Sequence, residues 1–362
     1  MFAPESRYVN GLPGSIPALL IHCHMQLTWT RTLLRLADSF RTAKANRTDK
    51  ETLWVRIAHD GIEGWGEAAP VDTYHQSLES AEHTLGKIGP LLGDDPTDIE
   101  GISARLTTTF ADQLATVCAV DAALHDWLGK RCGLPTVRVL GLSPRNIPLT
   151  SFSLGIGEPE EIVGKMQRAA AYPIIKLKVG SPRDEEILAV IRDLAPEKII
   201  RVDANTAWSV DEAMRMLPIL AKYKVEFVEQ PVAAKDRDGL RRLHEAGIRP
   251  IVADESCIRP EDVLPLAGCV TGINIKLSKC GGIRPALKMI HLARAVGLKV
   301  MLGCMIESSL GIAAAAQLAP LADWLDLDGH LLIANDPFMG IDGAGGRLRI
   351  GGGVGLGVVP VA

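Results

Sequence analysis

Short apolar runs separated by amphipathic stretches dominate the second half of the chain. Several of these runs end in a charged residue, as in IIKLKVG, IIRVDAN and VEFVEQP. Continuous apolar runs of this length are typical of parallel strands that are buried on both faces. The candidate strand ends recur at intervals of 22 to 28 residues, at Leu154, Lys178, Asp203, Glu229, Asp254, Lys276, Cys304 and Asp326. Because a strand, a loop and a helix fill such an interval, the pattern predicts eight parallel strands closed into a barrel.

The last of these units is incomplete. After Asp328 we find no long amphipathic segment before the glycine-rich stretch GAGGRLRIGGGVGLGV. We therefore predict a modified TIM barrel of the (β/α)7β type over residues 147–340, followed by a C-terminal segment over 341–362. A doubly wound open sheet is the alternative, but it would gather polar strand ends at one switch point instead of along most strands.

The chain before the barrel has a different pattern. Strand-like runs at 27–37, 51–58 and 62–68 include a His59-Asp60-Gly61 turn, which is a strong hairpin signal. Helical spacing follows over 75–90 and 98–140, with an apolar stripe made of Val117, Val120, Ala123, Leu124, Trp127 and Leu128. This order of strands and then helices predicts an α+β domain over residues 25–146.

Residues 1–24 are rich in glycine and proline and show no hydrophobic period, so we interpret them as an extension of the folded chain. His22 and His24 within it could be a metal pair, but two imidazoles without further ligands favour a solvated tail.

Composition narrows the class of protein. With 362 residues, 47% of them hydrophobic, the chain can bury a large core. A net charge of -4 and a pI near 6.2 provide no basic surface for nucleic acid. No apolar run reaches the roughly 18 residues that a membrane span needs. Seven scattered cysteines without a C-x-x-C pair suit a reducing compartment. We therefore expect a cytoplasmic protein that acts on a small molecule.

Three acidic residues end consecutive strands of the predicted barrel. Asp203, Glu229 and Asp254 would meet at the carboxyl ends of these strands, where barrel enzymes place their active sites. Three hard oxygen ligands suit Mg²⁺, and the lack of His or Cys beside them disfavours zinc. Asn205 follows Asp203 by two residues, so in continued strand geometry it would face the same side and orient a ligand or a water molecule.

Lysines end two further strands. Lys176 and Lys178 are two residues apart and face the same side of one strand, and Lys276 ends a strand four positions further on. Two ammonium groups and a nearby dication would lower the pKa of a lysine and allow it to act as a base. Lys279 and Lys288 are interpreted as surface lysines.

The motifs IKLKVG, VDAN, VEQP, ADES and INIKLSKCGG resemble, in order and spacing, those of the enolase superfamily and its muconate lactonizing enzyme subgroup. The resemblance runs from about Met25 to the end of the chain. It implies an α+β capping domain over the barrel, with residues 341–362 packing back on it. It also implies Mg²⁺ on the acidic trio and Lys178 with Lys276 as an acid/base pair. Mandelate racemase relatives would carry a histidine where this chain reads MLGCMIES, which disfavours that branch.

The reaction that the resemblance implies is removal of a proton α to a carboxylate, giving an enolate. With a base on each face, abstraction by one lysine and return from the other inverts the carbon centre. The Asp326-x-Asp328 pair resembles the motif with which dipeptide epimerases hold the ammonium of an N-terminal residue. Two carboxylates suit an ammonium group, since charge-assisted hydrogen bonds are strong. Ser153 and Lys176 are further candidate contacts of the substrate.

Residues 39–47, SFRTAKANR, resemble the loop that closes over the substrate in Ala-Glu epimerases. Arg47 lies where those enzymes place an arginine for the glutamate side chain, and Arg41 and Lys44 are competing candidates. Glu307 is interpreted as a support for Lys276, as a substrate contact or as a plain loop carboxylate.

We therefore predict an isomerase that epimerises a dipeptide, with L-Ala-D/L-Glu as the favoured substrate, a role in peptidoglycan peptide metabolism, and a possible homo-oligomeric state. The alternatives are a dipeptide epimerase of another specificity and a lyase or cycloisomerase of the same subgroup, such as o-succinylbenzoate synthase or muconate cycloisomerase. A non-catalytic metal-binding barrel is a third possibility, which would have no need of two opposed lysines.

Overall fold

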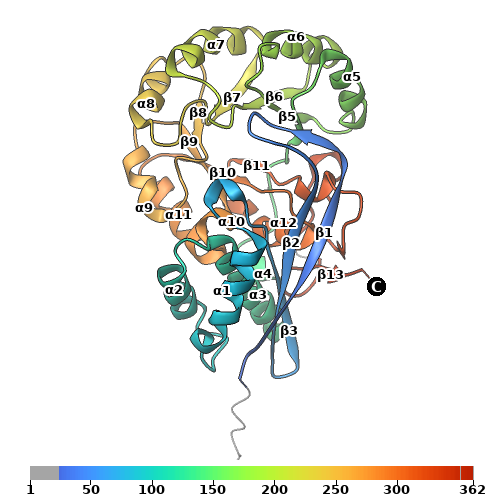
Figure 1. The fold of residues 1–362 in the computed structure, drawn as a ribbon, viewed down its shortest axis with the longest axis vertical. Coiled ribbons are helices and arrows are strands. Elements are labelled where there is room, and N and C mark those ends of the chain that lie inside the picture. The colour runs from blue at the N-terminus through green and yellow to red at the C-terminus, as the bar shows by residue number, and fades with distance from the viewer. Residues whose placement is uncertain (1–23, 351, 362) are drawn as a thin grey trace, which may run out of the picture.

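A three-stranded antiparallel sheet with helices covers one side of an eight-stranded parallel barrel (Figure 1). The structure, a computed structural model, describes residues 24–350 and 352–361. The expected extension at 1–24 therefore lies outside the described residues except for its last residue, and so does His22 of the histidine pair. Within the described chain, no helix combines the length and apolar character that a membrane crossing requires.

The antiparallel sheet has the strand order β1-β2-β3. The turn between the second and third strands is the predicted one, because Asp60 and Gly61 both have positive φ, 51° and 73°, as two-residue hairpin turns demand. The bounds of the three strands are β1 Gln26–Arg41, β2 Asn46–His59 and β3 Ile62–Ala68.

Helices pack on one face of this sheet. The predicted helical region 98–140 is broken into three helices, with a first break at 110–113. The second break follows because Gly133 ends the central helix in a left-handed conformation, φ 65°, and Pro135 comes next. The elements are η1 Asp72–Tyr74, α1 Leu78–Leu92, α2 Ile99–Thr109, α3 Leu114–Cys132 and α4 Thr136–Val139. We call β1–β3 together with these helices the cap.

Two glycines of β3 allow the sheet and α3 to approach closely. A methyl group on Gly64 would lie 2.0 Å from Ala123 O, and one on Gly66 would lie 2.0 Å from Ala119 O. Larger residues would force the strand and helix apart, so the GIEGWGEA sequence sets the spacing of the cap. The apolar stripe of α3 is buried in this contact, with Leu128 partly buried.

The parallel sheet has the order β4 to β11, and its edges meet where Thr150 bridges Leu325. The eight-stranded barrel that the apolar runs predicted is thereby confirmed. Its strands are β4 Phe152–Leu154, β5 Ile174–Lys178, β6 Ile199–Asp203, β7 Val225–Glu229, β8 Ile251–Ala253, β9 Gly272–Lys276, β10 Lys299–Gly303 and β11 Trp324–Asp326. Most expected strand ends are the observed ones, while Asp254 and Cys304 each follow their strand by one residue.

Helices connect these strands and cover the barrel. They are α5 Pro159–Arg168, α6 Asp184–Leu194, α7 Val210–Lys222, α8 Arg237–Glu245, α9 Pro260–Val263, η2 Leu264–Leu266, α10 Leu277–Cys280, α11 Ile283–Ala295, α12 Ser309–Ala316 and η3 Ala319–Leu321. After β11 the described elements are short, in agreement with the missing last helix: η4 Gly329–Leu331, β12 Phe338–Met339, η5 Ala344–Gly346 and β13 Val359–Pro360.

The C-terminal segment contacts the cap. Thr136 N donates to Gly355 O at 2.7 Å, and Leu356 N donates to Asp126 Oδ1 of α3 at 2.7 Å. The end of the chain thus lies against the last helices of the cap.

The tip of the β1–β2 hairpin lies over the carboxyl ends of the barrel strands (Figure 1). The segment expected as a loop over 39–47 is mostly strand, because Phe40 pairs with Arg47 and Arg41 with Asn46. Ile156 N, after β4, donates to Arg41 O at 2.8 Å. The hairpin therefore brings cap residues to the rim where the polar strand ends meet.

Candidate metal and acid/base site

The three acidic strand ends converge at the rim of the barrel. One oxygen from each of Asp203, Glu229 and Asp254 lies within 4.8 Å of the other two, and all three side chains are buried. The neighbouring pairing of Asp203 with Glu229 in the sheet explains this, because parallel strands in register place their ends together. The predicted cluster of hard oxygen ligands is thus formed.

The two candidate bases flank this trio. Lys178 of β5 donates to Asp203 Oδ2 at 2.6 Å, and Lys276 of β9 donates to Asp254 Oδ2 at 2.8 Å. The acidic residues come from the strands between β5 and β9 or from the residue that follows them. Both lysines line one cavity between the barrel rim and the cap. The spacing of the strands therefore puts the two amines on opposite sides of one acidic cluster.

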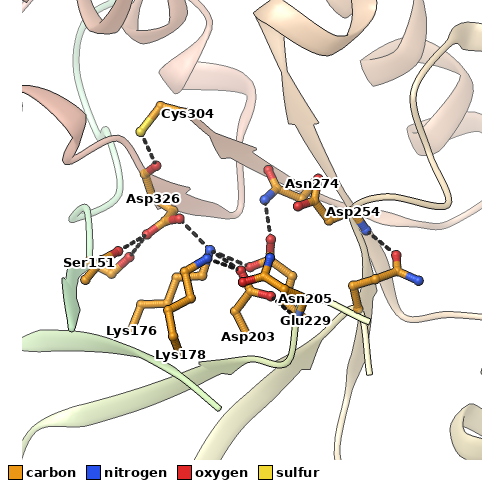
Figure 2. Close-up of polar contacts among 12 residues, drawn as sticks. Ser151, Lys176, Lys178, Asp203, Asn205, Glu229, Asp254, Asn274, Cys304 and Asp326 are labelled. Carbon is orange, nitrogen blue, oxygen red and sulfur yellow. Dashed lines mark hydrogen bonds and ion pairs between the residues drawn. The ribbon is translucent and has the colours of Figure 1, made fainter. Parts of the chain in front are cut away.

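Lys176 lies deeper and is 1% exposed. Its Nζ lies 3.2 Å from Asp203 Oδ2, 2.7 Å from Glu229 Oε2 and 2.6 Å from Asp326 Oδ2 (Figure 2). It joins the acidic trio to the last strand of the barrel, and it also lines the cavity.

Neighbouring carboxylates raise the pKa of two of these lysines in the structure. Burial alone lowers the pKa of Lys176, but the surrounding carboxylates outweigh it and hold that pKa well above its ordinary value. Burial also lowers the pKa of Lys276, but the charge of Asp254 and its neighbours outweighs it, so this pKa too lies well above its ordinary value. The sequence pattern showed the cations but not that each would lie within hydrogen-bond distance of a carboxylate.

Two residues that support the trio were not predicted. Lys279, interpreted as a surface lysine, is 2% exposed and donates to both Oδ1 and the main-chain oxygen of Asp254. Asn274 Nδ2 donates to Glu229 Oε1 at 2.7 Å (Figure 2). Asn274 precedes Lys276 by two residues on one strand, so the same alternation that selected Lys176 and Lys178 could have found it.

Gly303 makes room for this amide. A methyl group on Gly303 would lie 2.5 Å from Asn274 Oδ1, so a side chain at this position of β10 would displace Asn274 from Glu229.

Asn205 reaches the cavity by a route that differs from the predicted one. The strand ends at Asp203, and Asn205 and Thr206 both have positive φ, 45° and 69°. Asn205 N donates to Asp203 Oδ1 at 2.9 Å, and the side chain lines the cavity. A turn rather than continued strand geometry therefore aims this amide at the site.

Asp326 and Asp328 lie on the opposite wall of the cavity and are buried. Asp326 accepts from Lys176 and from Ser151 Oγ at 2.5 Å (Figure 2). Asp328 accepts from Ser153 N at 2.6 Å. Burial and the charge of Asp326 raise the pKa of Asp328 to about 7. Asp328 forms no ion pair within the described chain, so it is the carboxylate of this wall that a cationic ligand group could neutralise.

The cap lines the cavity with cations. Arg47, Lys44 and Lys50 contribute to its wall, whereas Arg41 is exposed and does not line it. Lys44 Nζ lies 3.2 Å from Glu255 Oε1, which neutralises its charge. Lys50 was not predicted; it donates to Pro70 O, and burial, followed by the charge of Arg47, lowers its pKa to about 8. Of the three candidates in 39–47, Arg47 is the one that lines the cavity without such an ion pair.

Glu307 and Ser153 complete the predicted residues. Ser153 lines the cavity, and its Oγ lies 3.4 Å from Asp326 Oδ1. Glu307 is buried behind the wall formed by Cys304, Met305 and Ile306, and it accepts from Met305 N at 3.3 Å. No hydrogen bond joins it to Lys276 among the described residues.

The donor set of the trio fits a divalent cation. Burial raises the pKa of Glu229, and the charges of Asp203 and Asp254 add to this effect and bring it to about 7. Lysines lie within hydrogen-bond distance of all three members, so a divalent cation would share these oxygens with them. Three carboxylate oxygens, with no His or Cys among them, match the ligands that Mg²⁺ prefers.

A capped parallel barrel with an acidic trio between two lysines defines the class of protein. The chain matches the description "Enolase C-terminal domain-like" over residues 160–360 and "Mandelate racemase / muconate lactonizing enzyme, N-terminal domain" over residues 25–141. The chain belongs to the enolase superfamily.

Several proteins that are similar to this chain are epimerases of dipeptides. The chain is 36% identical over 339 residues, 93% of this chain and 88% of the other, to the L-Ala-D/L-Glu epimerase of Bacteroides thetaiotaomicron. The substrate-liganded L-Ala-D/L-Glu epimerase of Bacillus subtilis has a TM-score of 0.89 and 31% identity, with 93% of this chain and 99% of that chain covered.

A third relative is in complex with a different dipeptide. The dipeptide epimerase of Methylococcus capsulatus in complex with Mg and L-Arg-D-Lys has a TM-score of 0.87 and 33% identity, with 92% of this chain and 99% of that chain covered.

Proposed function

We propose that the chain is a dipeptide epimerase that inverts the α-carbon of the C-terminal residue, with L-Ala-D/L-Glu as its substrate class. The observation that carries this proposal is the placement of Lys178 and Lys276 on two sides of one acidic trio, inside a single cavity. A substrate carboxylate held at the trio would present its neighbouring carbon to both amines. One base on each face is the arrangement that inversion requires, since a single base returns the proton to the side it came from.

The two lysines would act in opposite protonation states. One lysine, as a neutral amine, takes the α-proton, which breaks the C–H bond and leaves an enolate. The other, as an ammonium, gives a proton to the opposite face and forms the new C–H bond. Mg²⁺ bound by the trio would stabilise the charge of the enolate and draw carboxylate charge away from the lysines. Lys176 stays an ion-paired ammonium that adds positive charge beside the trio.

The ammonium of the N-terminal residue would bind at Asp328, with Asp326 beside it. Asp326 already accepts from Lys176, whereas Asp328 accepts from a backbone N–H group and has capacity for a cation. Because the pKa of Asp328 is raised to about 7, protonation below that pH would remove the charge that holds the ammonium. The value of kcat/KM should therefore fall as pH drops below about 7.

The side chain of the epimerised residue would face the cap. Arg47 and Lys50 make this wall cationic, which favours an acidic side chain, and Ser153 would contact the substrate from the first barrel strand. Relatives with cationic substrates exist, so this charge is the argument for Ala-Glu. Asn205 would orient the ligands of the metal or a water molecule.

Exchange of solvent deuterium into the α-position tests the function. We expect Mg²⁺-dependent exchange and epimerisation with L-Ala-L-Glu and none with Lys- or Arg-containing dipeptides. An Asp326→Asn, Asp328→Asn variant should lose the epimerase activity, while a lyase or cycloisomerase that uses the same lysines would be spared. Absence of exchange with every dipeptide would contradict the proposal and favour a metal-binding barrel without catalysis.

The wider setting is also proposed. We place the protein in the cytoplasm, acting on peptides released from peptidoglycan, with a dipeptide as its ligand and neither nucleic acid nor membrane as a partner. A homo-oligomer and the boundaries 25–146, 147–340 and 341–362 belong to the same proposal. The cationic cavity wall supports a dipeptide as the ligand. The cysteines, which form no disulfide in the described chain, support the cytoplasm.

A further inference from the structure

Two buried carboxyl groups meet where the cap contacts the barrel, behind the wall of the cavity. Glu67 lies near the end of β3 and is 2% exposed, and Glu307 lies between β10 and α12 and is 5% exposed. Buried carboxylates are normally paired with a cation, since burial of an isolated charge is costly. Within the described chain, the hydrogen bonds to both groups come from N–H and O–H donors instead.

The donors around Glu67 belong to the start of α12. Glu67 Oε2 accepts from Ser308 Oγ at 2.5 Å, from Ser308 N at 3.1 Å and from Gly311 N at 3.0 Å. Burial raises the pKa of Glu67, and these donors act against that effect. Two of these donors are backbone N–H groups, which cannot accept a proton from Glu67, and at the positive end of a helix they stabilise a carboxylate over a carboxylic acid. Glu67 is therefore the member of the pair that carries the negative charge.

Glu307 has fewer contacts that would stabilise a charge. Among the described residues it accepts one hydrogen bond, from Met305 N at 3.3 Å. A methyl group on Gly311 would lie 3.1 Å from Glu67 Oε2 and 3.2 Å from Glu307 Cδ, so the two carboxyl groups face the same glycine. Burial and then the charge of Glu67 raise the pKa of Glu307 to about 8. A second negative charge at this place would be costly near neutral pH.

Charged and titratable groups face Glu307 from each element around it. They are Glu67 of β3, Lys50 of β2, Lys276 of β9, Cys118 of α3 and Cys304 after β10. The two lysines favour a charged Glu307, but neither forms an ion pair with it within the described chain. Burial and Glu67 outweigh them.

We propose that Glu67 and Glu307 together hold a single proton, which resides on Glu307, and that they act as a positioning pair for the substrate cavity. Glu67, as a carboxylate, holds the first turn of α12 against the cap. Because Glu307 is a neutral acid, the segment 304–307 can pack beside this carboxylate, against the contact between α12 and the cap. That segment supplies Cys304, Met305 and Ile306 to the cavity wall. The pair thus links the cap to side chains that a substrate would contact.

The same segment supports the wall that carries Asp328. A methyl group on Gly329 would lie 2.5 Å from Met305 O and 3.0 Å from Glu307 N, so the turn after Asp328 packs directly on this segment. A shift of 304–307 would therefore move the candidate ammonium site. This kinetic consequence rests on the proposed function, whereas the shared proton does not.

Kinetics of two isosteric variants test the positioning role. Glu307→Gln keeps a neutral side chain, and we expect kcat/KM at pH 7 within about 3-fold of the wild-type value. Glu67→Gln turns an acceptor into an NH₂ group that faces N–H donors, and it should raise KM about 10-fold, more than it lowers kcat. Above about pH 8 the wild-type KM should rise as Glu307 ionises, and Glu307→Gln should lack that part of the rise.

Asp121 offers a matched control. It lies on α3, accepts from Ile283 N of α11 at 2.6 Å and thus caps a barrel helix from the cap, but it does not line the cavity. Asp121→Asn should lower the melting temperature and leave KM unchanged. If Glu67→Gln changes stability without changing KM, as this control does, the positioning role is wrong.

Infrared spectra and unfolding test the shared proton without any substrate. In the Mg²⁺-loaded protein at pH 7, the partly protonated Asp328 should contribute a carbonyl band in all variants. The further band of a protonated Glu307 should be present in the wild type and in Asp121→Asn, and absent in Glu307→Gln. Between the ordinary pKa of 4.5 and about 8, the unfolded chain has released the Glu307 proton and the folded chain keeps it. Stability should therefore fall as pH rises through this window, and less steeply in Glu307→Gln. Identical spectra and identical slopes in the two proteins would overturn the proposal, even if no dipeptide were turned over.

Discussion

Each of the two flanking lysines should serve one face of the substrate carbon. Lys178 and Lys276 approach the acidic trio from different strands and from different sides. Replacement of either lysine by methionine should reduce epimerisation about 10²- to 10⁴-fold, the usual contribution of a positioned acid or base. Each variant should still exchange deuterium into one of the two epimers, because the remaining lysine can remove and return the proton on its own face. Proton NMR of each epimer in D₂O measures this.

Loss of exchange with both epimers in both variants would contradict separate roles for the two lysines. Lys288, which pairs with Glu100 on the exposed surface, provides a control lysine whose replacement by methionine should leave both exchange rates unchanged.

Site residues could be predicted where the alternation of a strand decides which way a side chain points. The prediction failed where the reach of a long side chain or a turn decides which group it contacts. Lys176 and Lys178 follow from two-residue spacing at a strand end, and Lys276 follows from its place at the end of an apolar run. Lys279 was misread as a surface residue because its position in a short helix after β9 does not reveal that its chain folds back on Asp254. Asn205 reaches the site through two left-handed residues that no strand pattern predicts.

At the scale of elements, the β1–β2 hairpin should decide which side chain is accepted. Arg47 lines the cavity, while Arg41, paired across the hairpin with Asn46, does not. Replacement of Arg47 by methionine should raise KM for L-Ala-L-Glu about 10- to 100-fold, since a hydrogen bond to a charged group is worth about 1.5 to 3 kcal/mol. KM for L-Ala-L-Met should change little, because that side chain carries no charge. Steady-state kinetics with both dipeptides checks this.

Arg41→Met is the matched control, from the same hairpin but outside the cavity, and it should leave both KM values unchanged. Equal losses for the acidic and the neutral dipeptide in Arg47→Met would show that Arg47 supports the hairpin rather than selecting the side chain.

Elements were predicted well where one pattern persists and less well at interruptions. The 22- to 28-residue recurrence gave the barrel strands, because each βα unit repeats the same order of apolar run and helix. The region 98–140 was predicted without its breaks, since helical spacing of apolar residues continues across Gly133. The segment 39–47 was expected as a loop, because its polar residues do not reveal that strand pairing continues to Arg41.

For the whole molecule, a cation at the trio should stabilise the fold. Mg²⁺ that binds only the folded chain adds about 2.7 kcal/mol at 100 times its dissociation constant. The melting temperature should therefore rise with Mg²⁺ and return after chelation. Glu229→Gln should abolish this rise, because it removes one of the three carboxylates. Differential scanning calorimetry across a Mg²⁺ series measures the shift.

Glu226 lies on the same strand and pairs with Arg201 at 2.7 Å, so Glu226→Gln is the matched control. It should lower the melting temperature without changing the response to Mg²⁺. A full Mg²⁺ response in Glu229→Gln would place the metal elsewhere.

The sequence by itself determined the barrel, the α+β cap, the acidic trio and the opposed lysines. These features depend on local periodicity and on parallel strands that bring their carboxyl ends to one edge. The tertiary structure decided which groups touch: Lys279 on Asp254, Arg47 rather than Arg41 in the cavity, and Glu67 beside Glu307. Those contacts join residues from separate elements, whose mutual placement depends on the packing of the cap against the barrel and is not encoded in any local pattern.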